Sequence, residues 1–210
     1  MINGGVHGIF ILGTTGEGPS LSIELLQRTI TVATRHTAGR VPVLAGVTHP
    51  SYFESTSLAC HAADCGGVKD SSGDMNYFQK IVAVAKQRSD FTVLVGPESL
   101  MLDAIAAGGH GGVHRGANIC PGLIVTLYDT AVNGKNTDAL QEHLRSLGRI
   151  YSIGSNPVSS AIKAIKCSLS VLGICSDRMS QPFTAFTAHE RAQVERIIGS
   201  VMQQQAVVGR

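Results

Sequence analysis

Short runs of consecutive apolar residues alternate with longer amphipathic stretches in the first half of the chain. The runs predict strands at 8–12, 41–47, 67–69, 91–96 and 111–113. The stretches between them have apolar residues every three or four positions and predict helices around 22–35, 51–64, 75–87 and 98–107. Strands that are apolar throughout and separated by helices are typical of a parallel sheet that is covered on both faces.

The pattern changes to helices alone after the last of these strands. Pro157 suits the first turn of one helix, and Gly173 is placed to end it. The segment TAHE at 187–190 has the spacing of a capping box, in which a threonine and a glutamate satisfy each other's backbone N–H groups. We therefore predict an α/β part over residues 1–120 and a helical region over residues 121–210.

Composition narrows the class of protein. The 210 residues are 43% hydrophobic and 15% charged, a globular composition with enough apolar residues for one sizeable core. The net charge of +2, without a dense run of lysine and arginine, gives no basis for a nucleic-acid partner. No apolar run approaches the roughly 20 residues of a membrane span, and the first residues lack a signal-peptide pattern. We expect neither a membrane protein nor a secreted one.

The cysteines indicate a reducing compartment. There are five, at positions 60, 65, 120, 167 and 175, and none forms a C-x-x-C pair. We expect reduced thiols in a cytoplasmic protein, with no zinc site. His110 and His114 are four residues apart, but the glycines between them argue against a helix that would bring both side chains to one metal. The expectation for this segment is an ordinary strand and turn.

Three polar segments follow predicted strands, at the edge where parallel α/β folds carry their functional groups. The first is GTTGEG at 13–18, whose glycines permit close backbone approach to a ligand. Its Thr14 and Thr15 offer hydroxyl and N–H donors to an anion. The glycine spacing fits neither a Walker A loop nor a Rossmann fingerprint, and a plain tight turn is the alternative.

The second segment is GVKDSSGD at 67–74, in which Lys69 ends a strand. A partly desolvated lysine at this edge would have a lowered pKa, and its neutral amine could attack a carbonyl carbon to form a Schiff base. The alternative is a surface lysine paired with Asp70 or Asp74. The third segment, GGHGGVHRGAN at 108–118, is a glycine-rich strand end suited to close contact with a ligand, or simply a winding loop.

Together and in this order, these segments resemble the pyruvate-dependent class I aldolase family that includes dihydrodipicolinate synthase and N-acetylneuraminate lyase. The blocks that carry the resemblance are GIFILGTTGEGPSLS, VPVLAGV, GVKDSSGD, FTVLVG, GGVHRGANICP and IKCSLSVLG, and they extend over most of the chain. The resemblance implies a TIM barrel followed by a three-helix C-terminal region. It also implies a homo-oligomer, commonly a tetramer. We expect neither a cofactor nor a metal.

The resemblance assigns roles to four residues. Lys69 matches the lysine that forms the Schiff base with pyruvate or another 2-keto acid. Thr14 and Thr15 match the pair that holds the keto-acid carboxylate and helps to relay protons. Val113 matches the position whose backbone carbonyl faces the substrate in the synthase. The implied reaction forms or cleaves a carbon–carbon bond through an imine that accepts electrons from the adjacent carbon.

Two parts of the family pattern are absent from this sequence. The family has a first strand before the segment that matches Gly4, and two further strands with their helices between Gly66 and Gly67. The second stretch ends in a Tyr-Asn-x-Pro segment that supplies a proton-shuttling tyrosine and, nearby, an arginine that selects the second substrate. We therefore expect an incomplete α/β barrel of TIM type, with about five of eight βα units. Strand 41–47 is expected beside the strand that bears Lys69.

The function expected from these features is that of a Schiff-base-forming lyase or synthase that acts on pyruvate, most like dihydrodipicolinate synthase. The threonines of GTTGEG favour the synthases over the sialate lyases, which more often have serine within this motif. An N-acetylneuraminate lyase-like or sugar-acid aldolase activity is the alternative within the family. A catalytically silent homologue, acting as a binding or assembly partner of full-length subunits, is the alternative of another class.

Overall fold

The computed structural model describes residues 1–46, 67–87, 89, 91–154 and 156–208. Its strands are β1 (Ile9–Ile11), β2 (Val43–Ala45), β3 (Gly67–Asp70), β4 (Thr92–Val95) and β5 (Gly111–Gly112). Its α-helices are α1 (Ile23–Thr37), α3 (Met75–Ala85), α4 (Met101–Ala106), α5 (Pro121–Val132), α6 (Asp138–Gly148), α7 (Pro157–Val171) and α8 (Ala188–Val208). Short 3-10 helices are η1 (Ile2–Gly4), η2 (Thr14–Gly16), η3 (Gly18–Ser20), η4 (Glu98–Leu100), η5 (Arg115–Asn118) and η6 (Arg149–Ser152).

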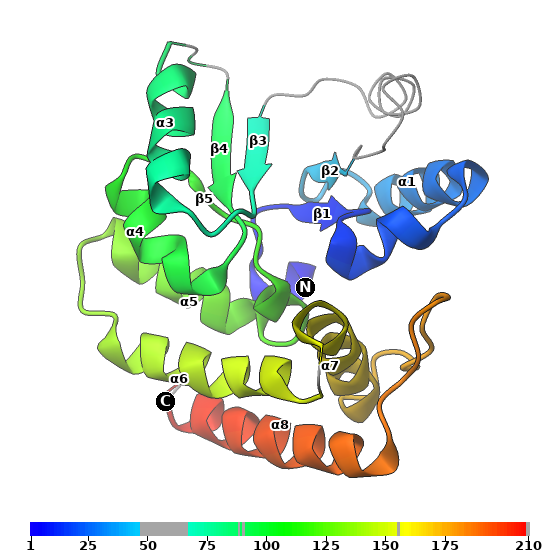
Figure 1. Cartoon of the computed structure of the whole chain (residues 1–210). Coiled ribbons are helices and arrows are strands. Elements are labelled where there is room, and N and C mark those ends of the chain that lie inside the picture. Colours follow the sequence, from blue (N-terminus) through cyan, green and yellow to red (C-terminus); the bar gives the residue numbers. More distant parts are fainter. Residues whose placement is uncertain (47–66, 88, 90, 155, 209–210) are drawn as a thin grey trace.

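These bounds confirm the strands and helices that the sequence predicts within the described residues. The helix expected around 51–64 lies outside them. Every strand pair among the described residues is parallel, as apolar strands separated by helices predict. β1 pairs with β2, and in a second sheet β4 lies between β3 and β5. Figure 1 shows β3 beside β4, and the pair of β1 and β2 next to α1.

The two sheets are not joined by strand pairing in the described part of the chain. The expectation that strand 41–47 lies beside the strand with Lys69 is therefore wrong, because β2 belongs to one sheet and β3 to the other. The physical reason is packing. Val68 of β3 lies against the apolar cluster that covers β4, so β3 is held by β4 rather than by the strand that precedes it in sequence.

Helices α3 and α4 cover one face of the three-stranded sheet. Val93 and Val95 of β4 are buried there against Phe78 of α3. Side chains alternate between the two faces of a strand, so Leu94 points to the opposite face. Lys69 is the register partner of Leu94, and it shares that face. The sheet thus directs its lysine away from the helices that cover it.

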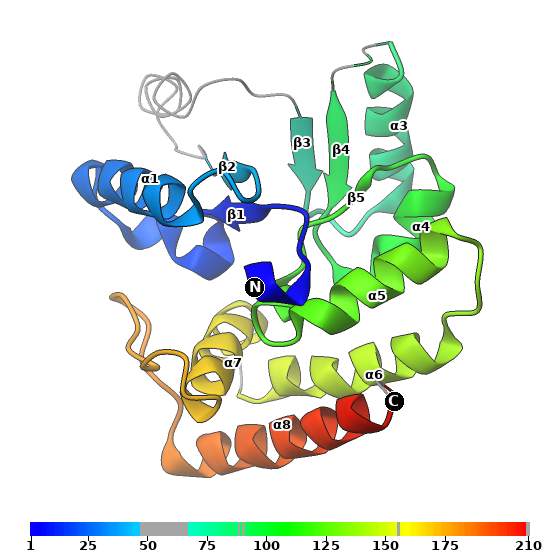
Figure 2. The ribbon, with the colours of Figure 1, turned by 180° about the vertical axis from the view of Figure 1, so that it is seen from behind.

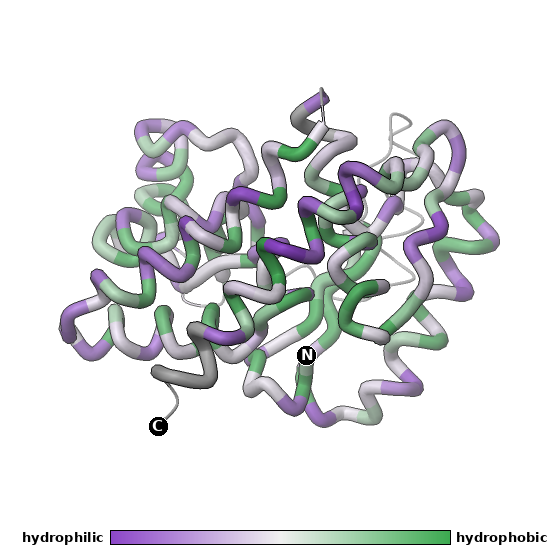
Figure 3. Tube along the Cα trace, turned by 90° about the horizontal axis from the view of Figure 1, so that it is seen from below, coloured by the Kyte–Doolittle hydropathy of each residue, from purple (hydrophilic) through white to green (hydrophobic). Residues whose placement is uncertain are grey.

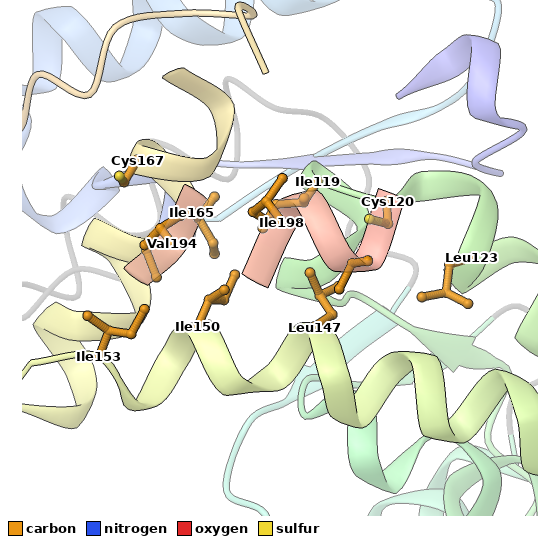
Figure 4. Packing of buried hydrophobic residues seen from close by; sticks show 12 residues of the cluster. Ile119, Cys120, Leu123, Leu147, Ile150, Ile153, Ile165, Cys167, Val194 and Ile198 are labelled. Carbon is orange, nitrogen blue, oxygen red and sulfur yellow. The ribbon is translucent and has the colours of Figure 1, made fainter. Parts of the chain in front are cut away.

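The largest buried cluster lies in the helical part that follows the strands. Figure 4 shows its side chains converging from several elements. Its members are Ile119, Cys120, Leu123, Leu147, Ile150, Ile153, Ala164, Ile165, Cys167, Val194, Ile198 and Val201. Helices α6 and α8 run side by side below the rest of the molecule in Figure 1 and in the opposite view of Figure 2. Residues of α7 belong to this cluster, which holds the helix against α8 and η6.

The helix ends agree with the signals in the sequence. Pro157 begins α7, and Gly173 just beyond its end has a positive φ of 71°. The Thr187 backbone N–H donates to Glu190 Oε2 at 2.8 Å, and the Glu190 N–H donates to Thr187 Oγ1 at 3.3 Å. The capping box is therefore confirmed. Figure 3 shows hydrophilic positions recurring among hydrophobic ones along the helices. None of the helices in the described part has the length and apolarity to cross a bilayer.

Candidate functional site

Lys69 extends from β3 across to the other sheet. Its Nζ lies over the ring of Phe10 in β1, 5.3 Å from the ring centroid. Its Cε lies 3.2 Å from the point where a Cβ on Gly96 would stand, so the glycine after β4 leaves room for the lysine stem. The residue is half-buried. No ion pair joins it to Asp70 or Asp74, whose carboxylates accept hydrogen bonds from Ser72 and from the start of α3.

The surroundings of Lys69 lower its pKa. Burial disfavours the ammonium form and lowers the pKa of Lys69 below its ordinary value, and the positive charge of Arg115 lowers it further. The negative charge of Glu98 acts in the opposite direction. The neutral amine is the nucleophile that Schiff-base formation requires. Burial and Arg115 therefore shift Lys69 toward the form that this reaction uses.

The GTTGEG loop follows β1 as two short turns. Thr14 begins η2 and is exposed, and Thr15 is half-buried. The ring of Phe10 lies 2.6 Å from the point where a Cβ on Gly13 would stand. The same ring faces the Lys69 ammonium, so Phe10 connects the beginning of this loop with the lysine. The loop and the lysine come from different sheets, and this contact brings them to one side of the molecule.

Val113 lies at the same edge as the lysine. Its N–H donates to the carbonyl of Val95 at 2.9 Å, just beyond the end of β5. The N–H of Gly96 donates in turn to the carbonyl of Asp70 at 2.7 Å. These bonds extend the ladder past the ends of β4 and β5. Val113 and Lys69 therefore flank the carboxyl end of β4, where a parallel sheet presents its functional groups.

A cluster of charged and aromatic side chains, to which the sequence analysis assigns no role, lies next to this edge. Glu98 accepts a hydrogen bond from the N–H of Gly116 at 2.6 Å and one from the hydroxyl of Tyr151 at 3.2 Å. Arg115 stacks over the ring of Tyr151, 5.4 Å from its centroid. Burial, followed by the charge of Glu98, raises the pKa of the Tyr151 hydroxyl, so this hydroxyl stays protonated. A cavity of about 450 Å³ opens here, lined by Arg115 and Leu102 among others.

Strand position alone could have drawn attention to two members of this cluster. Glu98 follows β4 in GPES and Arg115 follows β5 in GGVHRGAN, both at the edge that carries Lys69. Nothing in the sequence pattern marks Phe10 or Tyr151, because their roles depend on contacts between distant segments. A charged residue at or just after the end of a predicted strand is thus the sequence signal that marks Glu98 and Arg115, as well as Lys69.

The two histidines of the glycine-rich segment contact different parts of the backbone. His110 Nδ1 accepts from the N–H of Val93 at 3.0 Å. His114 is buried, and its Nδ1 lies 3.0 Å from the carbonyl oxygen of Gly96. Burial lowers the pKa of His114, so the ring is neutral. Among the described residues, no group of three His, Cys, Asp or Glu side chains has an arrangement that could hold a metal ion.

Known proteins match this chain both in sequence and in fold. The sequence profile of the dihydrodipicolinate synthetase family matches residues 1–67 and 63–201. The chain belongs to this family. A solved dihydrodipicolinate synthase from Bacteroides thetaiotaomicron is 33% identical, with a TM-score of 0.87 over 95% of this chain and 88% of that one. YagE, a prophage protein of this family from E. coli K12 solved with pyruvate, is 18% identical with a TM-score of 0.84, over 96% and 89% of the two chains.

The comparisons also locate residues that this chain lacks. A 4-hydroxy-tetrahydrodipicolinate synthase from Magnetococcus marinus is 24% identical over 259 aligned positions, which cover 93% of this chain and 86% of the relative. Since this chain has 210 residues, the relative has additional residues inside the aligned span. The family profile matches in two pieces that meet at 63–67, so the gap falls between β2 and β3. The fold is an incomplete TIM barrel followed by helices, as expected from the sequence.

Proposed function

We propose that this chain forms a Schiff base between Lys69 and pyruvate or a related 2-keto acid. The observation that carries the proposal is the Lys69 amine, half-buried over the Phe10 ring at the carboxyl edge of the sheet. Its lowered pKa, caused by burial and by Arg115, makes the nucleophile available nearer to neutral pH. Membership of a family of synthases and lyases agrees with this chemistry.

The proposed reaction begins with attack of the Lys69 nitrogen on the keto carbon. A carbon–nitrogen bond forms, and the keto oxygen leaves as water after it has taken up two protons. The protonated imine then accepts the electron pair released when the adjacent carbon loses a proton, which gives an enamine. The enamine carbon can attack an aldehyde or imine, and hydrolysis afterwards frees Lys69. In reverse, the same steps cleave a carbon–carbon bond.

The residues that we assign to the keto acid surround this amine. Thr14 and Thr15 would hold the carboxylate with hydroxyl and N–H donors, and the carbonyl of Val113 would face the substrate. The relatives' names favour the synthase direction. We also propose a cytoplasmic homo-oligomer, from the family resemblance and the cysteine pattern. The division into a barrel part, 1–120, and a helical region, 121–210, stays a prediction.

Reduction with borohydride in the presence of pyruvate tests the proposal. Borohydride converts an imine into a stable secondary amine, and peptide mass spectrometry then locates the adduct. We expect one adduct, on Lys69, and none in the Lys69→Arg variant, because a guanidinium stays protonated and cannot act as the nucleophile. The matched control is Lys80→Arg, which changes an exposed lysine of α3 and should leave the adduct unchanged.

The second candidate function is that of a catalytically silent assembly partner of full-length subunits. The absence of the Tyr-Asn-x-Pro segment from the sequence favours it, because positioned acid–base catalysis contributes about 10²–10⁴-fold to a rate. A folded sample that traps no adduct would support this alternative. So would an adduct spread over Lys80, Lys86 and Lys166, since reaction at several lysines would show no preference for Lys69.

A further inference from the structure

Glu17, the acidic residue of GTTGEG, is not available to a ligand at the mouth of the sheet. It is only 6% exposed, although Thr14 and Gly16 of the same loop are exposed. Its Oε1 accepts a hydrogen bond from the backbone N–H of Ser180 at 2.8 Å. Its Oε2 forms an ion pair with Lys166 Nζ at 2.5 Å. Both partners belong to the part of the chain that follows the strands.

Lys166 links three segments at this point. It comes from α7, and its ammonium also donates to the carbonyl of Arg178 at 3.0 Å. Ser180 and Arg178 belong to the segment between α7 and α8. A buried carboxylate is stable only when it is paired and hydrogen-bonded, and here the partners come from α7 and from the segment after it. The carboxylate thus binds the loop after β1 to both.

The backbone of Glu17 closes the turn that carries the threonines. Its N–H donates to the carbonyl of Thr14 at 3.0 Å, and the N–H of Gly18 donates to the carbonyl of Gly13 at 3.2 Å. Glu17 itself has a φ of +59°, in the left-handed region that non-glycine residues adopt only when their surroundings hold them there. Fixing the Glu17 carboxylate therefore fixes the conformation of the turn that contains Thr14 and Thr15.

From these contacts we propose that Glu17 and Lys166 are positioning residues for the keto-acid cradle. The ion pair holds the 13–18 loop in the conformation that presents Thr14 and Thr15 to the substrate carboxylate. Through Lys166, the helical region would hold the loop that binds the substrate, although none of its residues need touch the substrate. This inference rests on the proposed function for its effect on binding, but the loop conformation can be tested without any substrate.

The test compares Lys166→Met and Glu17→Gln with a matched control. Lys166→Met leaves the buried carboxylate without its cation, and Glu17→Gln removes the charge while keeping an oxygen that can accept from Ser180. The control is Lys163→Met, which changes a lysine on the same helix whose ammonium contacts Thr184 rather than Glu17. Circular dichroism melting first establishes a temperature at which all variants are folded.

The first measurement is hydrogen exchange of the 13–18 amides without pyruvate. In Lys166→Met we expect faster exchange at Glu17 and Gly18, the amides that close the turn, while Lys163→Met exchanges as the wild type does. The second measurement is the pyruvate concentration that half-saturates adduct formation with borohydride. We expect it to rise about tenfold or more in Lys166→Met, since small displacements of positioning groups have effects of this size. Glu17→Gln should have a smaller effect.

The outcomes test the positioning role of Glu17 and Lys166 separately from Schiff-base formation by Lys69. Unchanged exchange at 13–18 in a folded Lys166→Met variant would overturn the positioning role. Faster exchange with unchanged half-saturation would also overturn it, because the ion pair would then stabilise the loop without serving binding. If the wild type traps no adduct, the proposed function is wrong. The hydrogen-exchange result then still tests whether the Glu17–Lys166 ion pair fixes the conformation of the 13–18 loop.

Discussion

The helical region and the strand-bearing part bury their residues in different ways. Around α6, α7 and α8, a single cluster of twelve buried residues includes several with no exposed surface, such as Ile150 and Val194. Among the described residues, the strand part has two smaller clusters, with six residues around β4 and with Leu12 and Leu26 beside β1. Large apolar side chains of the β1–α1–β2 unit remain exposed, with Val32 57% exposed and Leu25 46%. In the part of the chain that the structure describes, most of the buried apolar side chains therefore belong to the helical part rather than to the strands.

The largest buried cluster and the candidate site residues thus belong to different parts of the chain. Lys69 and the GTTGEG loop belong to the two strand sheets, which no strand pairing joins among the described residues. The gap relative to the relatives falls between these sheets. The Glu17–Lys166 ion pair connects the loop after β1 with α7 of the helical region. Through this pair, the loop that carries Thr14 and Thr15 contacts the helical region directly.

The largest effect is expected from truncation in the helical cluster. Ile150 has no exposed surface, and Ile150→Ala should lower the free energy of unfolding by about 2–5 kcal/mol through lost burial and a residual cavity. Leu26→Ala, in the smallest cluster, should cost less because its surroundings are more open. Urea denaturation of both variants measures the difference. Equal losses in the free energy of unfolding would contradict the difference in packing between the two regions.

An intermediate effect is expected from helix caps in the two parts. Thr187→Ala removes the hydroxyl of the capping box before α8 and should cost about 1 kcal/mol. Ser22 caps α1 through one bond to the N–H of Leu25 at 3.3 Å, so Ser22→Ala should cost less. Thermal unfolding of both variants checks the order. A larger loss for Ser22→Ala would mean that α1 contributes more to stability than its sparse packing indicates.

The smallest effect concerns the charge beside the lysine. Arg115 lowers the pKa of Lys69, so Arg115→Met should move that pKa upward, toward its ordinary value. Less free amine is then present at neutral pH, and the pH profile of borohydride trapping should shift to higher pH. Arg145→Met is the control, since Arg145 lines the same cavity but pairs with Glu142 on α6. A profile that stays in place, or moves to lower pH, would contradict the role of Arg115.

Much of the candidate site could be predicted because it is encoded locally. Strands, turns and caps depend on residues close in sequence, so the apolar runs alone suffice to put GTTGEG, Lys69 and Val113 at strand ends. The capping box at Thr187 follows the same logic, since its bonds join residues three apart. The wrong expectation concerned which strands are neighbours, because the pairing of distant segments leaves no local signature.

The sequence by itself determined the alternation of strands and helices, the family blocks and the lysine at a strand end. Only the tertiary structure decided that Lys69 lies over Phe10 and is influenced by Arg115. It alone assigned Glu17, which in the sequence is part of an anion-binding pattern, to an ion pair with Lys166. Desolvation and electrostatic attraction act through space between groups far apart in the chain, so they arise only when packing has brought those groups together.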